Sequence, residues 1–323
     1  MHIINTIAPV FLLIGLGFAL RLGRFLSEDF ARSLNRLAYW VGLPCLLFYK
    51  VALTEHDFAS AGKTFAVVFG ATIVAVAVSY LTAFAMRIPP ASWGTFVQGG
   101  HRGNLAYIGL AIVIYSLSGA GKDLQNAELV RSTEAIAVLV LAMIVPVYNF
   151  ISVTVLLVSK HQIDRGIFGR VFRGVITNPL IIASVCGLGY SFLFDSMPLA
   201  IGRSLNALGQ MSLPVALMAI GASLTGKKVI CENFKPAVAA SLIKVVVAPL
   251  AGYAIARAIG LGSGEMLVAM VLLACPTAVA SYVMTQEIGG NAPLSARIVV
   301  ISTILSAVSL AMAVGWAAPM LQN

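Results

Sequence analysis

Long apolar stretches separated by short polar connections run along the whole chain. An apolar run of about 20 residues can cross the hydrocarbon core of a membrane as a helix. Ten such stretches are present, and we expect each to be a transmembrane helix: 3–22, 30–53, 64–86, 94–118, 132–158, 174–195, 198–225, 236–259, 264–286 and 293–319. The pattern predicts an all-α membrane protein with ten transmembrane helices.

The composition supports this interpretation. Hydrophobic residues make up 59% of the 323 residues, charged residues make up 10%, and the mean hydropathy is +0.95. A water-soluble domain needs a largely polar surface, so this composition indicates a multi-pass membrane protein. Arg21 and Arg24 follow the first apolar stretch instead of preceding it. That order favours a first transmembrane helix over a cleaved signal peptide.

The 21 basic residues are unevenly divided between the two sides of the membrane. Thirteen lie in connections that follow odd-numbered stretches, five lie on the opposite side, and Lys50, Arg102 and Lys244 fall inside stretches. Cytoplasmic loops are enriched in Lys and Arg. The bias therefore places both termini on the extracytoplasmic side of the cytoplasmic membrane. Topology accounts for the net charge of +9, so no nucleic-acid partner is expected.

Several sequence features recur at one spacing. Three residue pairs are 170 positions apart, and one tetrapeptide recurs after 171: Pro9 and Pro179, Pro44 and Pro214, Arg87 and Arg257, and RSLN at 32–35 and 203–206. This order argues for two five-helix units, at 1–158 and 174–323, joined by a basic cytoplasmic loop at 159–173. Five is odd, so the second unit enters the membrane from the opposite side. Inverted repeats of this kind are typical of secondary transporters. Pro44, Pro179 and Pro214 are expected to shape the helices around a site.

The ninth stretch contains a helix-breaking residue. In LLACPTAVASYV, at 272–283, Pro276 removes one helical N–H and frees carbonyl groups of the preceding turn. In a membrane these groups need other partners. We expect the backbone at Cys275 and Pro276, with the hydroxyls of Thr277 and Ser281, to line a substrate site. The alternative is that Pro276 only kinks the helix.

The fourth stretch is weakened at the matching position. GGHRGNLAYIGLA, at 99–111, contains Gly103 and Gly109, and each glycine costs a helix about 1 kcal/mol relative to alanine. Asn104 offers a donor and an acceptor beside the freed backbone. A second half-helix that starts near Tyr107 would turn its positive dipole end toward the site, which favours an anion. Alternatively, the glycines allow close helix packing and Asn104 joins two helices.

Four further polar residues fall inside apolar stretches. An intramembrane cation marks a substrate path by default, so Arg102 and Lys244 are expected to give the site a positive potential. The alternative for both is that the side chain extends to the membrane interface. Tyr148 and Asn149, in PVYNF, are polar groups of the fifth stretch that can face the same site.

Several kinds of chemistry have no support in the sequence. No Asp or Glu lies in the middle of a stretch, so no carboxylate proton relay is visible. No metal or cofactor is expected, and the coupling ion, H⁺ or Na⁺, stays open. The chain shows no convergent nucleophile, base or metal cluster for a membrane enzyme. It also shows no soluble output domain for a membrane sensor that binds without translocation. The cysteines stand alone, without metal-ligand spacing: Cys45, Cys186, Cys231 and Cys275.

The chain resembles the auxin efflux carrier family, whose bacterial members include malonate-carrier-type proteins. GNLAYIGLA, at 103–111, is similar to the Gly-Asn-x-Gly-Phe-x-Gly-x-Pro crossover of the family's fourth helix, and CPTAVASYVMTQEIGG, at 275–290, resembles its ninth. Other segments resemble its sixth, seventh and eighth helices: NPLIIA at 178–183, LPVALMAIGASL at 213–224 and IKVVVAPL at 243–250. The chain departs from the crossover pattern at Ala106 and Tyr107, and at Ala111, which replaces the proline.

The resemblance implies a scaffold domain and a transport domain, with broken helices four and nine crossing in the latter. It implies an organic anion, commonly a carboxylate, bound near Asn104, and a homodimer. The predicted function is therefore a secondary transporter that moves a small organic anion by alternating access. A sodium-coupled symporter of the bile-acid type shares the inverted-repeat plan and is the alternative among carriers.

Overall fold

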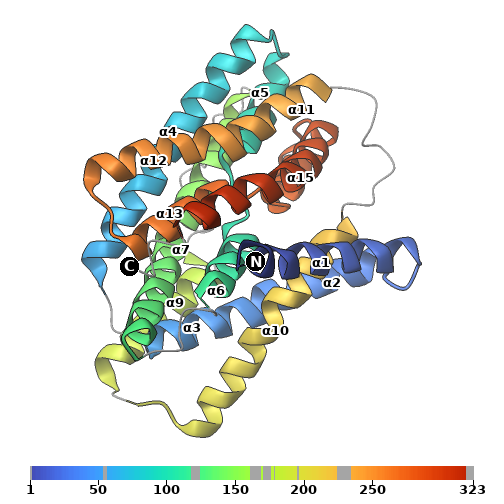
Figure 1. Cartoon of the computed structure of the whole chain (residues 1–323). Coiled ribbons are helices and arrows are strands. Elements are labelled where there is room, and N and C mark those ends of the chain that lie inside the picture. Colours follow the sequence, from blue (N-terminus) through green and yellow to red (C-terminus); the bar gives the residue numbers. More distant parts are fainter. Residues whose placement is uncertain are drawn as a thin grey trace.

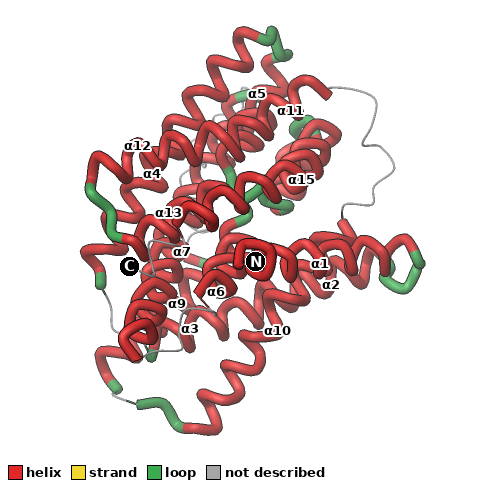
Figure 2. The backbone as a smooth tube through the Cα atoms, in the orientation of Figure 1, coloured by secondary structure: helices red, strands yellow, loops and turns green. Residues whose placement is uncertain are grey.

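The computed structural model describes residues 2–53, 57–117, 124–160, 169, 176–177, 179–194, 196–223 and 234–317. Every secondary-structure element in these ranges is a helix, which confirms the predicted all-α class (Figures 1 and 2). The described part contains five helices that are long and apolar enough to cross a membrane: Phe58–Ala85, Glu128–Val158, Leu199–Ala222, Phe234–Ile259 and Ala292–Trp316. Shorter apolar helices accompany them: Thr6–Leu22, Leu105–Leu117, Pro179–Leu193 and Ser263–Ala274.

Each predicted stretch contains helix, in one piece or in several. Six stretches hold one helix each: α1 (His2–Leu22), α4 (Phe58–Ala85), α7 (Leu124–Val158), α9 (Pro179–Leu193), α10 (Leu199–Ser223) and α15 (Ala292–Ala317). Two stretches hold helices joined by a π-helical turn: α2 (Glu28–Leu37), η1 (Ala38–Gly42) and α3 (Leu43–Ala52), then α11 (Phe234–Leu242), η3 (Ile243–Val247) and α12 (Ala248–Ile259). The basic loop predicted at 159–173 lies almost entirely outside the described residues.

The fourth and ninth stretches are interrupted. In the fourth, α5 (Pro90–His101) ends, and the chain becomes helical again at η2 (Leu105–Gly109) and α6 (Leu110–Leu117). In the ninth, α13 (Ser263–Ala274) ends before Pro276, and α14 (Ala280–Ile288) begins after it. Proline therefore ends a helix here instead of only kinking it.

The helices form two groups that meet along α6 and α7 and where α1 packs on α15 (Figure 1). In the first group, α1 packs on α10 and α3 packs on α9. Glycines bring these helices close, since a Cβ on Gly17 would collide with the backbone of Met218, and one on Gly187 would lie 2.9 Å from the carbonyl oxygen of Phe48. In the second group, α4, α5, α11, α12, α13 and α15 pack around one another.

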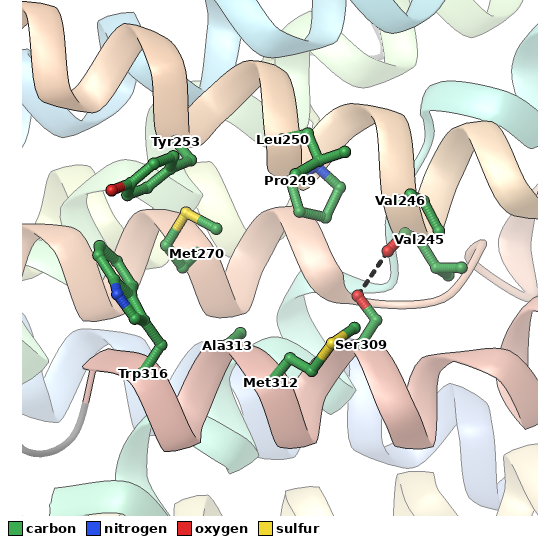
Figure 3. Close-up of a pocket in the computed structure, with 10 residues that line it drawn as sticks. All are labelled: Val245, Val246, Pro249, Leu250, Tyr253, Met270, Ser309, Met312, Ala313 and Trp316. Atoms are coloured by element: carbon green, nitrogen blue, oxygen red, sulfur yellow. Dashed lines mark hydrogen bonds between the residues drawn. The ribbon is translucent and has the colours of Figure 1, made fainter.

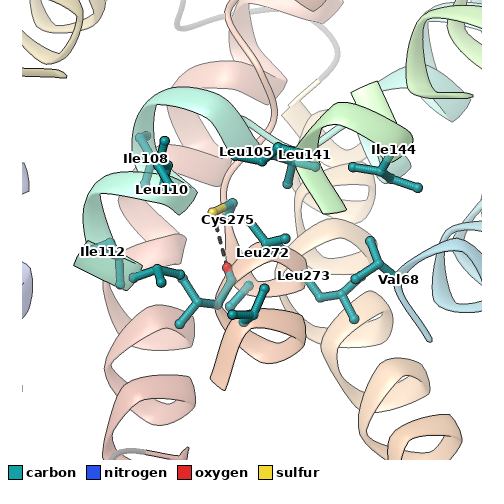
Figure 4. Close-up of a cluster of buried hydrophobic side chains, with 14 of the residues drawn as sticks. Val68, Leu105, Ile108, Leu110, Ile112, Leu141, Ile144, Leu272, Leu273 and Cys275 are labelled. Atoms are coloured by element: carbon teal, nitrogen blue, oxygen red, sulfur yellow. Dashed lines mark hydrogen bonds between the residues drawn. The ribbon is translucent and has the colours of Figure 1, made fainter. Parts of the chain in front are cut away.

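The buried centre of the second group is α13. Each of its residues from Gly264 to Ala274 is buried. Leu272 and Leu273 belong to an apolar cluster that also contains Leu105 and Ile108 from η2 (Figure 4). The interrupted stretches are thus embedded in protein, a setting in which a non-helical backbone is tolerated at membrane depth.

Candidate functional site

The two interruptions pair with each other. Gly103 and Thr277 form an antiparallel β-bridge. The Asn104 amide donates to the carbonyl of Pro276 at 2.8 Å, and the Ala278 amide donates to the carbonyl of Arg102 at 2.9 Å. Each interruption therefore supplies hydrogen-bond partners for the other. Backbone groups that are not in a helix need such partners within a membrane.

Side chains satisfy the helix ends beside this crossing. The Thr277 hydroxyl donates to the carbonyl of Gly99 near the end of α5 at 2.7 Å. The Thr277 amide donates to the hydroxyl of Ser302 on α15 at 3.0 Å. At the end of α13, the ammonium of Lys244 donates to the carbonyl of Leu273 at 2.5 Å. Thr277 and Lys244 thus act as caps for carbonyl groups that have no partner within their own helix.

Three polar groups at the crossing are left with unused hydrogen-bonding capacity. Asn104 is only 5% exposed, and its side-chain amide makes no hydrogen bond within the described part of the chain. The hydroxyls of Tyr107 and Ser281 are buried and also have no partner there. Buried polar groups are normally hydrogen-bonded. Three groups without a partner on the two crossing stretches therefore favour a ligand site.

Arg102 adds a cation to the same place. Its side chain is 9% exposed, and its Nη2 donates to Oδ1 of Asn149 on α7 at 2.7 Å. Its Nη1 contacts the sulfur of Met284 on α14. No Asp or Glu of the described ranges forms an ion pair with Arg102. A buried cation is normally paired, so the arrangement leaves room for an anionic partner.

Lys244 is a second buried cation with a different setting. It is fully buried, and a Cβ on Gly103 would lie 3.0 Å from its Cε. Complete burial excludes the alternative in which this side chain extends to the membrane interface. Its ammonium donates to the carbonyl of Leu273, so a second buried cation lies beside the crossing.

The polar residues of α7 are divided between two roles. Asn149 reaches Arg102, as described above. The Tyr148 hydroxyl instead hydrogen-bonds the hydroxyl of Thr72 at 3.2 Å, and its ring meets that of His101 edge to face at 5.9 Å. His101 is held by the carbonyl of Val97 at 2.7 Å. Tyr148 is thus an anchored neighbour of the crossing.

Other predicted residues serve packing. Cys275 donates through Sγ to the carbonyl of Val271 at 3.1 Å, and a Cβ on Gly109 would lie 3.1 Å from that sulfur (Figure 4). Pro179 begins α9, Pro44 is the second residue of α3, and Pro214 lies inside α10. These three helices belong to the first group, and the role of the prolines in shaping them stays a prediction.

Two residues at the site were not predicted from the sequence. Tyr39, in η1, lies near the side chains of Arg102 and Tyr107. Gln98 is fully buried in α5, where its Oε1 accepts a hydrogen bond from Thr285 at 3.0 Å. Gln98 is an amide within an apolar stretch, and that signal could have identified it. Within the described ranges, no group of three or more His, Cys, Asp or Glu residues could hold a metal ion.

Comparison with known proteins identifies the family. A family model described as "Membrane transport protein" matches residues 2–167 and 154–314. A protein of Rhizobium meliloti (strain 1021) named "Putative malonate transporter" is 24% identical over 317 residues, which cover 94% of this chain and 92% of that protein. A rice protein named "Probable auxin efflux carrier component 3b" is 26% identical over 147 residues, 44% of this chain and 25% of its own length.

The family model spans nearly the whole chain, and the bacterial relative aligns along most of both proteins. The apolar helices fit this result, because they make a multi-pass membrane protein. The chain therefore belongs to the auxin efflux carrier family of membrane transport proteins.

Proposed function

We propose that this chain moves a small organic anion, a carboxylate, across the cytoplasmic membrane and binds it where the fourth and ninth stretches cross. Arg102 would pair with the carboxylate, and the side-chain amide of Asn104 would donate a hydrogen bond to it. Tyr107 and Ser281 would contribute hydroxyl donors. The observation that carries the proposal is a buried guanidinium without a carboxylate partner in the described part, next to polar groups with unused capacity.

Charge at the crossing supports an anion over a neutral or cationic substrate. Arg102 and Lys244 are both buried there, and neither forms an ion pair with a described Asp or Glu. The backbone becomes helical again at Leu105 and at Ala280, next to the crossing, and the first turn of a helix carries partial positive charge. The name of the bacterial relative refers to malonate, a dicarboxylate.

Close contacts in the first helix group support the inverted-repeat part of the proposal. Gly17 of α1 packs against Met218 of α10, and Gly187 of α9 packs against Phe48 of α3. Gly17 and Gly187 are 170 positions apart in the sequence, and Phe48 and Met218 are separated by the same number of positions. Equivalent residues exchange roles between the halves, as expected for two copies related by a two-fold axis in the membrane plane.

Transport by alternating access would require the two helix groups to move relative to each other. An ion pair joins Lys50 on α3, in the first group, to Glu134 on α7, along which the two groups meet. Such a contact would have to form and break during the cycle. Both termini outside the cell and a homodimer belong to the same proposal, and the coupling ion is left open.

The proposal is tested by flux in proteoliposomes. Purified protein is reconstituted into vesicles. Separate batches of these proteoliposomes are loaded with labelled malonate, with another labelled carboxylate or with a labelled neutral amide of similar size. Protein-dependent flux of a carboxylate but not of the amide is expected. Binding without flux would instead indicate a sensor, and chemical conversion of the substrate would indicate an enzyme. The same assay with and without a sodium gradient separates a sodium-coupled symporter from a carrier independent of sodium.

A further inference from the structure

An apolar groove lies on the outside of the second helix group. It runs between α12 and α15, and Met270 of α13 forms its floor (Figure 3). Its volume is about 380 Å³. Leu250 and Met312 line it and are 63% and 61% exposed, so the groove opens on the surface that faces lipid in a membrane protein.

The two ends of the groove differ. At one end the rings of Tyr253 and Trp316 meet edge to face at 4.8 Å (Figure 3). At the other end the Ser309 hydroxyl donates to the carbonyl of Val245 at 2.6 Å and closes the groove. Tyr and Trp concentrate at the membrane interface, and Trp316 lies next to the end of α15. The aromatic end is therefore the interfacial end, and the Ser309 end points toward the membrane centre.

The length of the groove fits one leaflet. Val246 of η3 and Tyr253 of α12 both line it and are seven residues apart in the continuous span Phe234–Ile259, which corresponds to about 11 Å at 1.5 Å per residue. Half of the hydrocarbon core of a bilayer is about 15 Å thick. Part of an acyl chain that enters at the aromatic end would fill the groove, which ends before the midplane.

A cation stands beyond the interfacial end. Arg257 lies four residues after Tyr253 on α12, which places both on one face of the helix. The Arg257 side chain is exposed and forms no ion pair with a described residue. Neither α12 nor α15 contains an Asp or Glu. A guanidinium matches the phosphate of a lipid headgroup and can bind it through two parallel hydrogen bonds.

We propose that this groove is a binding site for an anionic phospholipid, with one acyl chain between α12 and α15 and the headgroup phosphate at Arg257. The charge at Arg257 favours this occupant over a second copy of the chain. The floor of the groove is Met270, on the helix that ends at the crossing. A bound lipid would therefore contact α13 four residues before that helix ends. The site does not depend on the identity of the transported substrate.

The test is native mass spectrometry of the full chain in detergent, after addition of phosphatidylglycerol or of phosphatidylcholine with the same acyl chains. The wild type is expected to retain phosphatidylglycerol about fivefold more than phosphatidylcholine, the factor typical of one basic residue. Arg257→Gln should bring the two lipids to equal retention. Val246→Phe should fill the groove and reduce the retention of both.

Matched variants keep the test specific. Arg203 on α10 is also exposed, so Arg203→Gln removes the same charge elsewhere. Val308, on α15, is 62% exposed and does not line the groove, so Val308→Phe adds the same ring outside it. Both controls should behave as the wild type. If Val246→Phe is poorly folded, Leu250→Trp provides a second filling variant at a more exposed position.

Three results would overturn the proposal. The first is equal retention of the two lipids by the wild type. The second is unchanged lipid retention in well-folded Val246→Phe and Leu250→Trp. The third is a dimer mass that these filling variants alone abolish, which would assign the groove to a second copy of the chain.

Discussion

Arg102 Nη2 donates a hydrogen bond of 2.7 Å to Oδ1 of Asn149, which links the cation of the crossing to α7. The amide oxygen is neutral, so it orients the guanidinium without compensating its charge. Asn149→Asp would replace this oxygen with a carboxylate and pair Arg102 internally. We expect affinity for a carboxylate substrate to fall at least about tenfold, since charge-assisted bonds contribute about 1.5–3 kcal/mol. Uptake of labelled malonate by proteoliposomes measures the change.

Asn149→Ser is the matched control for this variant. It replaces the amide with a neutral hydroxyl and adds no charge, so transport should fall by less than in Asn149→Asp. Equal transport by Asn149→Asp and the wild type would show that the charge of Arg102 is not used for the substrate.

Asn104 should be required for binding and dispensable for folding. Its backbone N–H donates across the crossing to Pro276, its backbone C=O accepts from Ile108 and Gly109 in η2, and its side-chain amide makes no hydrogen bond in the described part. Asn104→Ala leaves the backbone bonds in place, so protein abundance should stay unchanged while carboxylate flux falls about tenfold or more. Asn35→Ala, on the exposed face of α2, is the surface control. Normal flux in Asn104→Ala would remove this side chain from the site.

Thr277 should matter for stability, because its hydroxyl and amide both make buried hydrogen bonds. Thr277→Val keeps the shape but leaves the carbonyl of Gly99 without this donor, at a cost of about 1–3 kcal/mol. The melting temperature of purified Thr277→Val should therefore decrease, whereas Thr277→Ser should melt close to the wild type. A Thr277→Val protein as stable as Thr277→Ser would mean that water or another group satisfies Gly99.

The ion pair between Lys50 and Glu134 predicts a charge-swap result. The side chains are 31% and 16% exposed, so we expect each single variant, Lys50→Glu or Glu134→Lys, to lose about 1–2 kcal/mol through like-charge contact. The double variant restores opposite charges and should recover at least half of the lost melting temperature. Additive losses in the double variant would show that the two side chains do not interact in solution.

The sequence predicted the helix interruptions, because proline and glycine destabilise the helix that contains them. Pro276 cannot continue a helix, and the glycines around Asn104 weaken one, so both interruptions were predictable from composition and spacing. The buried location of Lys244 was not, because a lysine inside an apolar stretch fits both a buried and an interfacial position. Only the packing of η3 against α13 decides between them.

Partners far apart in the chain were also beyond sequence reasoning. Arg102 meets Asn149, 47 residues later, and Met284, 182 residues later. The sequence placed Asn149 among the residues that can face the site, but nothing in the local pattern pairs it with Arg102. Met284 gave no signal, since a methionine in an apolar helix is an ordinary packing residue. Tyr39 was missed for the same reason, because the π-helical turn that contains it has no sequence signal of its own.

The crossing itself is joined through main-chain atoms, the Asn104 and Ala278 amides and the carbonyls of Pro276 and Arg102. Every residue type offers a carbonyl, and every type except proline offers the amide, so these two bonds are indifferent to most substitutions. A crossing built this way can keep its geometry while the surrounding side chains change. Substrate preference could therefore diverge during evolution without rebuilding the centre of the protein, and a proline at position 104 or 278 is the one replacement that would remove a bond directly.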